Sequence, residues 1–162
     1  MEEIYFTRLK VGYPGERHPP EDVPGSWKIF TICHGPSPKA CQTIKDVTQL
    51  SSVDDIKEAR LLFIDLANKA KTGLNLSLLY DIKICHEAHS FTHGHKECKI
   101  FRIRRSGIRA YFVYFDGKII ILIKTDSKRK QKLSVGEKKV LEDIAKSVID
   151  RLSDDDFYSK VV

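Results

Sequence analysis

The feature that most constrains the fold is a series of three short segments, separated by glycine turns, in the second half of the chain. The segments are rich in β-branched and aromatic residues, and two-residue turns ending in glycine between such segments are typical of β-hairpins. The segments are Lys99–Arg105, Ile108–Phe115 and Lys118–Thr125, with the turns Ser106-Gly107 and Asp116-Gly117 between them. The sequence therefore predicts three consecutive antiparallel strands.

Counting outward from the turns predicts which side chains share a face of this sheet. Side chains alternate between the two faces with a period of two residues, so rows of facing residues can be assigned if each turn has two residues. The rows predicted on one face are Arg104–Arg109–Lys124 and Arg102–Tyr111–Leu122. The rows predicted on the other face are Phe101–Phe112–Ile121 and Ile103–Ala110–Ile123. We therefore expect the second face to form the core and the first to remain open.

The positive charge of the chain is concentrated in the same region. Residues 96–132 contain twelve Lys or Arg and three acids, a net charge of +9, whereas the whole chain carries +6 and the remainder therefore −3. Like charges directly opposite one another in a sheet repel, so a row of three cations is explained if phosphate normally occupies it. The alternative is an ordinary solvated face, although solubility alone favours mixed signs. A basic face on a small sheet is typical of proteins that bind a polyanion.

Length and composition favour a globular protein. A chain of 162 residues is long enough for one compact domain, or for a domain of about 110 residues with an extension. No apolar run approaches the ~18 residues of a membrane span, so we expect no membrane partner. The N-terminus, Met-Glu-Glu-Ile, is acidic, unlike a secretion signal. The four cysteines form no CxxC pair, and we interpret them as reduced thiols of a cytoplasmic protein.

The remaining segments predict an α+β fold in which helices cover one face of a small antiparallel sheet. Helices are expected over Ser51–Lys71 and from the capping pattern at Ser134 to Leu152. Two further strands, Glu3–Val11 and Trp27–Cys33, flank a long loop rich in Pro and Gly. We divide the chain into an N-terminal extension (1–50) of unknown role, a domain (51–152) and an acidic tail (153–162), in which we expect Asp154-Asp155-Asp156 to be frayed.

The segment from Cys85 to Cys98 contains four of the six histidines and two cysteines. Three interpretations remain open: a polar loop with incidental histidines, a source of a catalytic histidine, or a structural zinc site. Neutral histidine is a suitable general base near pH 7, and His93 and His95 lie nearest the basic strand. Zinc ligands would come from Cys85, His89, His93 and Cys98, but no standard finger spacing is present.

Residues 99–151 resemble the RelE/HigB-like endoribonuclease toxins (RelE/ParE superfamily) of bacterial toxin–antitoxin systems. Members share a basic strand, a Gly-x-Arg-x-x-Tyr-like strand, a hairpin and a basic pair before a final helix. The matching stretches are Ile100–Arg104, Gly107–Tyr114, Asp116–Lys118 and Lys128–Lys132, followed by the helix from Ser134. The resemblance implies a RelE-like fold and cleavage of messenger RNA in the ribosome without a metal cofactor. It also implies an acidic protein antitoxin as the partner.

The resemblance also assigns roles to residues by position. Arg109 and Arg129 correspond to the arginines that stabilise the phosphorane transition state. Tyr111 shares the predicted face of Arg109 and is therefore a candidate catalytic residue for proton transfer. Residues expected to hold the RNA backbone are Arg102, Arg104, Lys124, Lys128, Lys130 and Lys132. Many relatives supply a Tyr or His after the basic pair, whereas residues 131–136 here contain neither. The alternative hypothesis is therefore a non-catalytic RNA- or protein-binding module on the same fold, possibly with a zinc-stabilised His/Cys segment.

Overall fold

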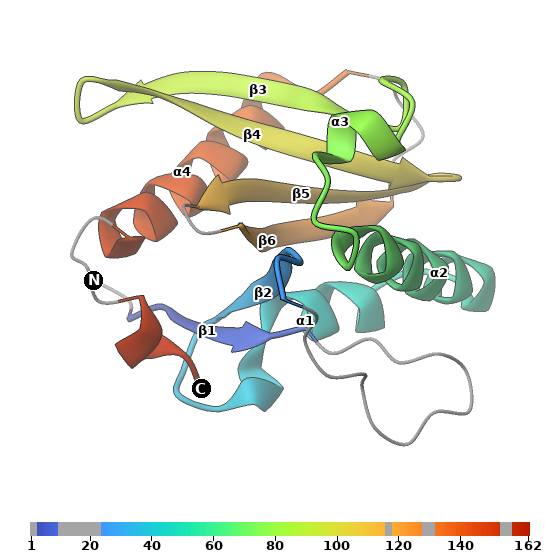
Figure 1. The fold of residues 1–162 in the computed structure, drawn as a ribbon, viewed down its shortest axis with the longest axis horizontal. Coiled ribbons are helices and arrows are strands. Elements are labelled where there is room, and N and C mark those ends of the chain that lie inside the picture. Colours follow the sequence, from blue (N-terminus) through green and yellow to red (C-terminus); the bar gives the residue numbers. More distant parts are fainter. Residues whose placement is uncertain (1–2, 10–23, 116–117, 128–131, 153–156) are drawn as a thin grey trace.

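The computed structural model describes residues 3–9, 24–115, 118–127, 132–152 and 157–162. The fold is α+β, as predicted, and its centre is one six-stranded sheet with the order β1-β2-β6-β5-β4-β3 (Figure 1). The sheet is mixed rather than purely antiparallel, because β2 pairs with β6 in parallel. The strands are β1 Tyr5–Arg8, β2 Lys28–Cys33, β3 Cys85–His93, β4 Lys96–Arg105, β5 Ile108–Phe115 and β6 Ile119–Ser127. The helices are α1 Gln42–Thr48, α2 Val53–Ala70, α3 Leu76–Leu79 and α4 Val135–Leu152, with 3-10 turns η1 Pro38–Ala40 and η2 Tyr158–Lys160.

Helices cover both faces of the sheet, so the prediction of one open face was wrong (Figure 1). On one face, α2 packs against a core that includes Ile103 and Phe112. On the other face, α4 packs against Ile100, Tyr111 and Val113, so it does not lie on the face for which it was predicted. The physical reason is that β5 is apolar on both sides, and an apolar surface must be buried on each face.

The predicted hairpin of β4 and β5 is confirmed, with Arg102 facing Tyr111 and Arg104 facing Arg109. The predicted register of β5 against β6 was wrong. Phe115 faces Ile119 rather than Lys118, and a bulge between Tyr111 and Phe112 shifts the pairing by one further residue. In consequence the residue facing Arg109 is Asp126, Lys124 faces Tyr111, and Leu122 and Thr125 face Phe112 and Ala110. The predicted turn Asp116-Gly117 lies outside the described residues.

Local sequence determines where the two long helices begin. The Ser52 hydroxyl caps α2 by accepting a hydrogen bond from the backbone N–H of Asp55 at 3.1 Å. At α4 the predicted capping box is confirmed. Glu137 N–H donates to the Ser134 hydroxyl, and Ser134 N–H donates to the Glu137 carboxylate, both at 3.1 Å. These bonds fix the first turn of α4 above the sheet.

Both ends of the described chain join the same edge of the sheet. β1 pairs with β2, and the backbone N–H of Val162 donates to the carbonyl of Phe6 at 2.7 Å. Phe157 is only 3% exposed, and its ring packs against Phe6 and Phe30 at centroid distances of 4.8 and 5.0 Å. An aromatic side chain therefore anchors residues 157–162, and the three aspartates expected to be frayed lie outside the described residues.

The histidine-rich segment is a strand and not a loop. β3 pairs with β4 along its length, from Cys85 opposite Ile103 to His93 opposite Lys96. Its pairing shifts at a bulge between Glu87 and His89. The turn is Gly94-His95, and both residues have positive φ angles, 58° and 64°. A two-residue turn with this backbone suits the twist of a β-hairpin.

Candidate anion-binding site

A cavity of about 210 Å³ lies where the start of α4 passes over the α4-facing side of the sheet. Strands β3, β4 and β5 contribute its inner wall, and α4 with the segment before it contributes the outer wall. We call this cavity the arginine pocket; its lining residues are His86, Ala88, Arg102, Arg109, Tyr111, Lys132, Leu133 and Lys138. None of these described lining residues is acidic.

Two buried arginines form the inner wall of the arginine pocket. Arg102 is 7% exposed and Arg109 is 4% exposed, and the Nε atom of each is buried without a hydrogen-bond partner. Arg102 donates through Nη2 to the Lys83 carbonyl at 3.2 Å and to Nε2 of His86 at 2.7 Å. Among the described residues, no carboxylate forms an ion pair with either arginine. An unpaired buried charge is costly, so this wall favours an anion.

The electrostatics of the arginine pocket also favour a bound anion. Burial lowers the pKa of Arg102 below its ordinary value, and the nearby charges of Arg109 and Arg104 lower it further. The guanidinium groups therefore repel one another in a region with little water to screen them. A phosphate oxyanion would remove this repulsion and could accept the free Nε–H bonds, because guanidinium groups match phosphate oxygens well.

Tyr111, on β5, lines the arginine pocket together with the two arginines. It is fully buried, and its hydroxyl has no hydrogen-bond partner of good geometry. Burial and the nearby Asp126 carboxylate raise its pKa to about 12, although Arg109 acts in the opposite direction. The hydroxyl is therefore protonated at neutral pH and can donate a hydrogen bond to a bound anion.

His86 is a site residue that the sequence analysis did not select. A guanidinium group can only donate, so Nε2 of His86 accepts the bond from Arg102. The hydrogen of the ring is then on Nδ1, which donates to the Glu87 carbonyl at 2.7 Å. A two-residue count back from the Gly94-His95 turn would place His86 opposite Ile103, and only the bulge at Glu87/His89 aligns it with Arg102. A bulge of this kind leaves no clear pattern in a single sequence.

The other predicted RNA-binding residues are distributed more widely. Lys132 lines the arginine pocket. Arg104 faces Arg109 in register but does not line the pocket, and Lys124 lines a separate cavity beside α1 with Asp46. Residues predicted for this site that lie outside the described residues are Lys128, Arg129 and Lys130.

The structure places His93 and His95 away from the arginine pocket. His93 lies seven residues along β3 from His86, roughly 20 Å at the rise of an extended strand. Its Nε2 atom lies 2.7 Å from the Asp150 carboxylate of α4, and His89 lies 2.6 Å from Glu142 of the same helix. His95 is exposed in the turn. His89 and His93 therefore join β3 to α4.

The four residues considered for zinc do not form a metal site. Cys85 belongs to the core beneath α2, whereas His89 and His93 bind carboxylates of α4. The thiol of Cys98 contacts the Lys96 carbonyl at 3.7 Å. Within the described ranges, no group of three or more His, Cys, Asp or Glu side chains could hold a metal ion. The zinc alternative was therefore wrong for these residues.

Comparison of the chain with protein-family models and with curated proteins found no match. Among the helices that the structure describes, none is long and apolar enough to cross a membrane.

Proposed function

We propose that this protein is an RNA-cleaving toxin of the RelE/HigB-like kind, acting on messenger RNA in the ribosome, and that the arginine pocket holds the scissile phosphate. The observation that supports this most directly is the pair Arg102 and Arg109, each more than nine-tenths buried, with free Nε–H donors and no described carboxylate partner. The order of basic, aromatic and glycine residues along β4 and β5, which resembles that of the RelE/HigB-like toxins, also supports the proposal. The expected partner is an acidic antitoxin, and the expected location is the cytoplasm.

The proposed reaction is internal transfer at one phosphodiester. The ribose 2′-oxygen forms a bond to phosphorus and gives up its proton, and the bond from phosphorus to the 5′-oxygen breaks. The 5′-oxygen takes a proton, which leaves a 2′,3′-cyclic phosphate and a 5′-hydroxyl. Arg102 and Arg109 would stabilise the additional negative charge on the phosphorane, and no metal is needed for that role. Among the described histidines, His86 is the one whose ring lines the arginine pocket.

RNA end analysis tests the proposal. Purified protein is incubated with messenger RNA, with and without ribosomes, in the presence of a chelator. We expect fragments with cyclic phosphate and 5′-hydroxyl ends, and no cut at a position where a 2′-deoxynucleotide replaces the ribonucleotide. Intact RNA under all conditions, or cutting that continues at the 2′-deoxy position, would contradict the proposed reaction.

A histidine series tests which ring takes part. We expect His86→Ala to lower the cleavage rate by about 10²-fold, the usual contribution of a positioned acid or base, while RNA affinity changes little. His93→Ala and His95→Ala are the controls, and both should cleave at the wild-type rate. If His86→Ala loses affinity as strongly as rate, the histidine only positions Arg102.

One observation favours a second function. Nε2 of His86 is occupied by Arg102, and the Tyr111 hydroxyl is fully buried, so neither group is poised for proton transfer in this arrangement. A non-catalytic module that binds RNA through the arginine pocket would have this geometry. Tight RNA binding without cleavage, with ribosomes present, would support the module over the enzyme.

A further inference from the structure

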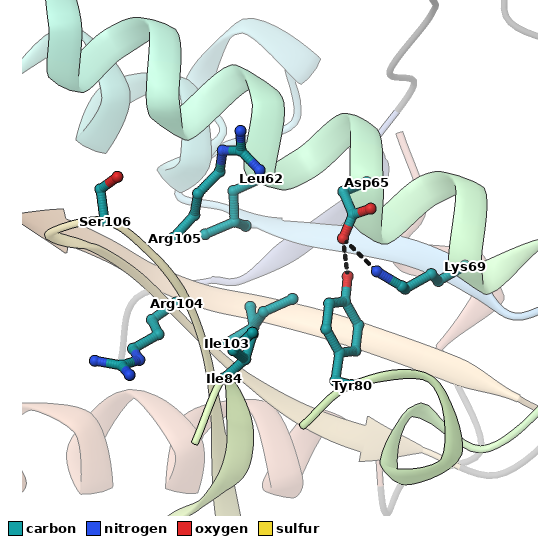
Figure 2. A pocket seen from close by; sticks show the side chains of 9 residues that line it. All are labelled: Leu62, Asp65, Lys69, Tyr80, Ile84, Ile103, Arg104, Arg105 and Ser106. Carbon is teal, nitrogen blue, oxygen red and sulfur yellow. Dashed lines mark hydrogen bonds and ion pairs between the residues drawn. The ribbon is translucent and has the colours of Figure 1, made fainter. Parts of the chain in front are cut away.

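A second and larger cavity, of about 540 Å³, lies on the opposite face of the sheet, between α2 and the end of β4 (Figure 2). We call it the α2 cavity; the lining residues used below are Leu62, Asp65, Tyr80, Ile84, Ile103 and Arg104. Its volume falls in the range of sites that hold small organic ligands. The proposed function assigns no role to it.

The α2 cavity combines an apolar floor with one free acceptor. Leu62, Ile84 and Ile103 supply the floor. Asp65 Oδ2 accepts hydrogen bonds from Tyr80 at 2.9 Å and Lys69 at 2.8 Å, which fixes the carboxylate. The side chain of Asp65 is 43% exposed, and Oδ1 accepts no hydrogen bond from a described residue. A fixed carboxylate oxygen beside an apolar surface favours a ligand that combines an apolar body with a hydrogen-bond donor.

Arg104 supplies a positive charge on the other side of the floor. Figure 2 shows Asp65 and Tyr80 on one side of Ile84 and Ile103, and Arg104 on the other. The Arg104 side chain forms no hydrogen bond or ion pair with any described residue, unlike Arg105, whose Nε lies 2.8 Å from Glu58. Arg104 is therefore available for an anionic group of the same ligand.

The position of Arg104 connects the α2 cavity to the arginine pocket. It lies two residues from Arg102 on β4, about 6.6 Å along the strand, and faces Arg109 on β5. The pairing of β3 with β4 ends at Cys85 and Ile103, with one further bond from Arg104 N–H to the Ile84 carbonyl. Beyond that bond β4 is a sheet edge. An extended RNA strand could therefore pass from one face of the sheet to the other at Arg104.

From this arrangement we propose that the α2 cavity binds a nucleotide whose base carries an exocyclic amino group. The amino group donates to Asp65 Oδ1, the base lies on the apolar floor, and the phosphate binds Arg104. Adenine, cytosine and guanine carry this group. Uracil offers only its imide N–H, which lies between two carbonyl oxygens that a carboxylate repels. The inference rests on the proposed function in one respect: in RNA, this nucleotide is a neighbour of the phosphate held in the arginine pocket.

Mononucleotide binding tests the proposal without relying on cleavage. AMP, CMP, GMP and UMP are titrated into the wild-type protein and followed by NMR and calorimetry. We expect UMP to bind about tenfold more weakly than the others, a difference comparable to one hydrogen bond to a charged group. Chemical shifts should change at Tyr80 and Ile84 with the nucleosides as well as the nucleotides, whereas changes at His86 report phosphate in the arginine pocket. Equal binding of UMP, or shifts confined to the arginine pocket, would overturn the inference.

Two variants locate the contacts. Asp65→Asn keeps one oxygen that can accept the hydrogen bond from Tyr80, but it places an amide NH2 where the free carboxylate oxygen Oδ1 was. An amide NH2 cannot accept a hydrogen bond from a base, so the preference against UMP should disappear. Asp54→Asn, on the exposed first turn of α2, makes the same charge change and should retain the preference. In titrations followed at Tyr80 and Ile84, Arg104→Gln should make AMP and adenosine bind equally, whereas the wild type prefers AMP. If Asp65→Asn unfolds the protein, the Arg104 comparison still decides the outcome.

The same variants separate this inference from the proposed function. Arg109→Met should weaken phosphate binding in the arginine pocket, but the chemical-shift changes at Tyr80 and Ile84 and the preference against UMP should remain. If RNA is never cleaved but the base preference depends on Asp65, the proposed function fails and the site stands. If RNA is cleaved but no base preference is found in either RNA cleavage or mononucleotide binding, the α2 cavity is not a nucleotide site.

Discussion

Replacing Arg109 with methionine is expected to reduce RNA cleavage by 10² to 10³-fold, the usual loss when one preorganised electrostatic donor is removed from a reacting centre. The free energy of unfolding should not fall, and we expect it to rise. Arg109 is 4% exposed, has a free Nε–H and has no described ion-pair partner, so methionine removes a buried charge and keeps most of the apolar stem. Cleavage rates and thermal unfolding of the same preparation measure the two effects.

The control for this variant is Arg60→Met. Arg60 is exposed on α2, away from the arginine pocket, so the same chemical change should alter neither cleavage nor stability. If Arg109→Met destabilises the fold by more than about 2 kcal/mol while cleavage per folded molecule is retained, Arg109 is a structural residue and the proposed site is wrong. A gain in stability with a loss of activity is the pattern expected of functional sites.

Phe157→Ala should give the largest loss of stability among the described residues outside the helices and strands. Its ring is 3% exposed and contacts Phe6, Phe30 and Phe115, so truncation leaves a cavity between β1, β2 and β5. Substitutions of this kind cost about 3–5 kcal/mol. In a chain of 162 residues the midpoint of thermal unfolding should fall by on the order of 10 °C.

Tyr158→Ala is the matched control. Tyr158 is the adjacent aromatic residue but is 67% exposed, so its removal should change stability by less than about 0.5 kcal/mol. Equal effects of the two substitutions would mean that the C-terminal segment does not pack as described.

Local patterns predicted the elements of the fold well. The turn Ser106-Gly107 predicted the β4–β5 register, and the Ser134–Glu137 box predicted the start of α4, because both signals depend only on nearby residues. The burial of both sheet faces could also have been predicted from the sequence. Residues 110–115 form a continuous apolar run, which is typical of a strand buried on both sides.

The pocket itself could not be predicted from local patterns. The bulge at Glu87/His89 decides that His86 faces Arg102. The bulge at Tyr111/Phe112, together with the pairing of Phe115 with Ile119, decides that Asp126 faces Arg109. Each bulge inserts one residue and reverses the alternation that the prediction relied on. The burial of Arg102 and Arg109 was equally unexpected, since arginine is usually exposed and only the packing of α4 encloses these two.

The parallel pairing of β2 with β6 has a consequence for synthesis on the ribosome. Lys28 pairs with Ile119, so a nascent chain must extend by ninety-one residues before β2 gains this neighbour. Until then one edge of β2 has no partner, and such edges attract other chains. Contacts of this sequence separation also slow folding. A factor that shields emerging polypeptides should therefore increase the yield of this protein more than it would for a sheet built from hairpins alone.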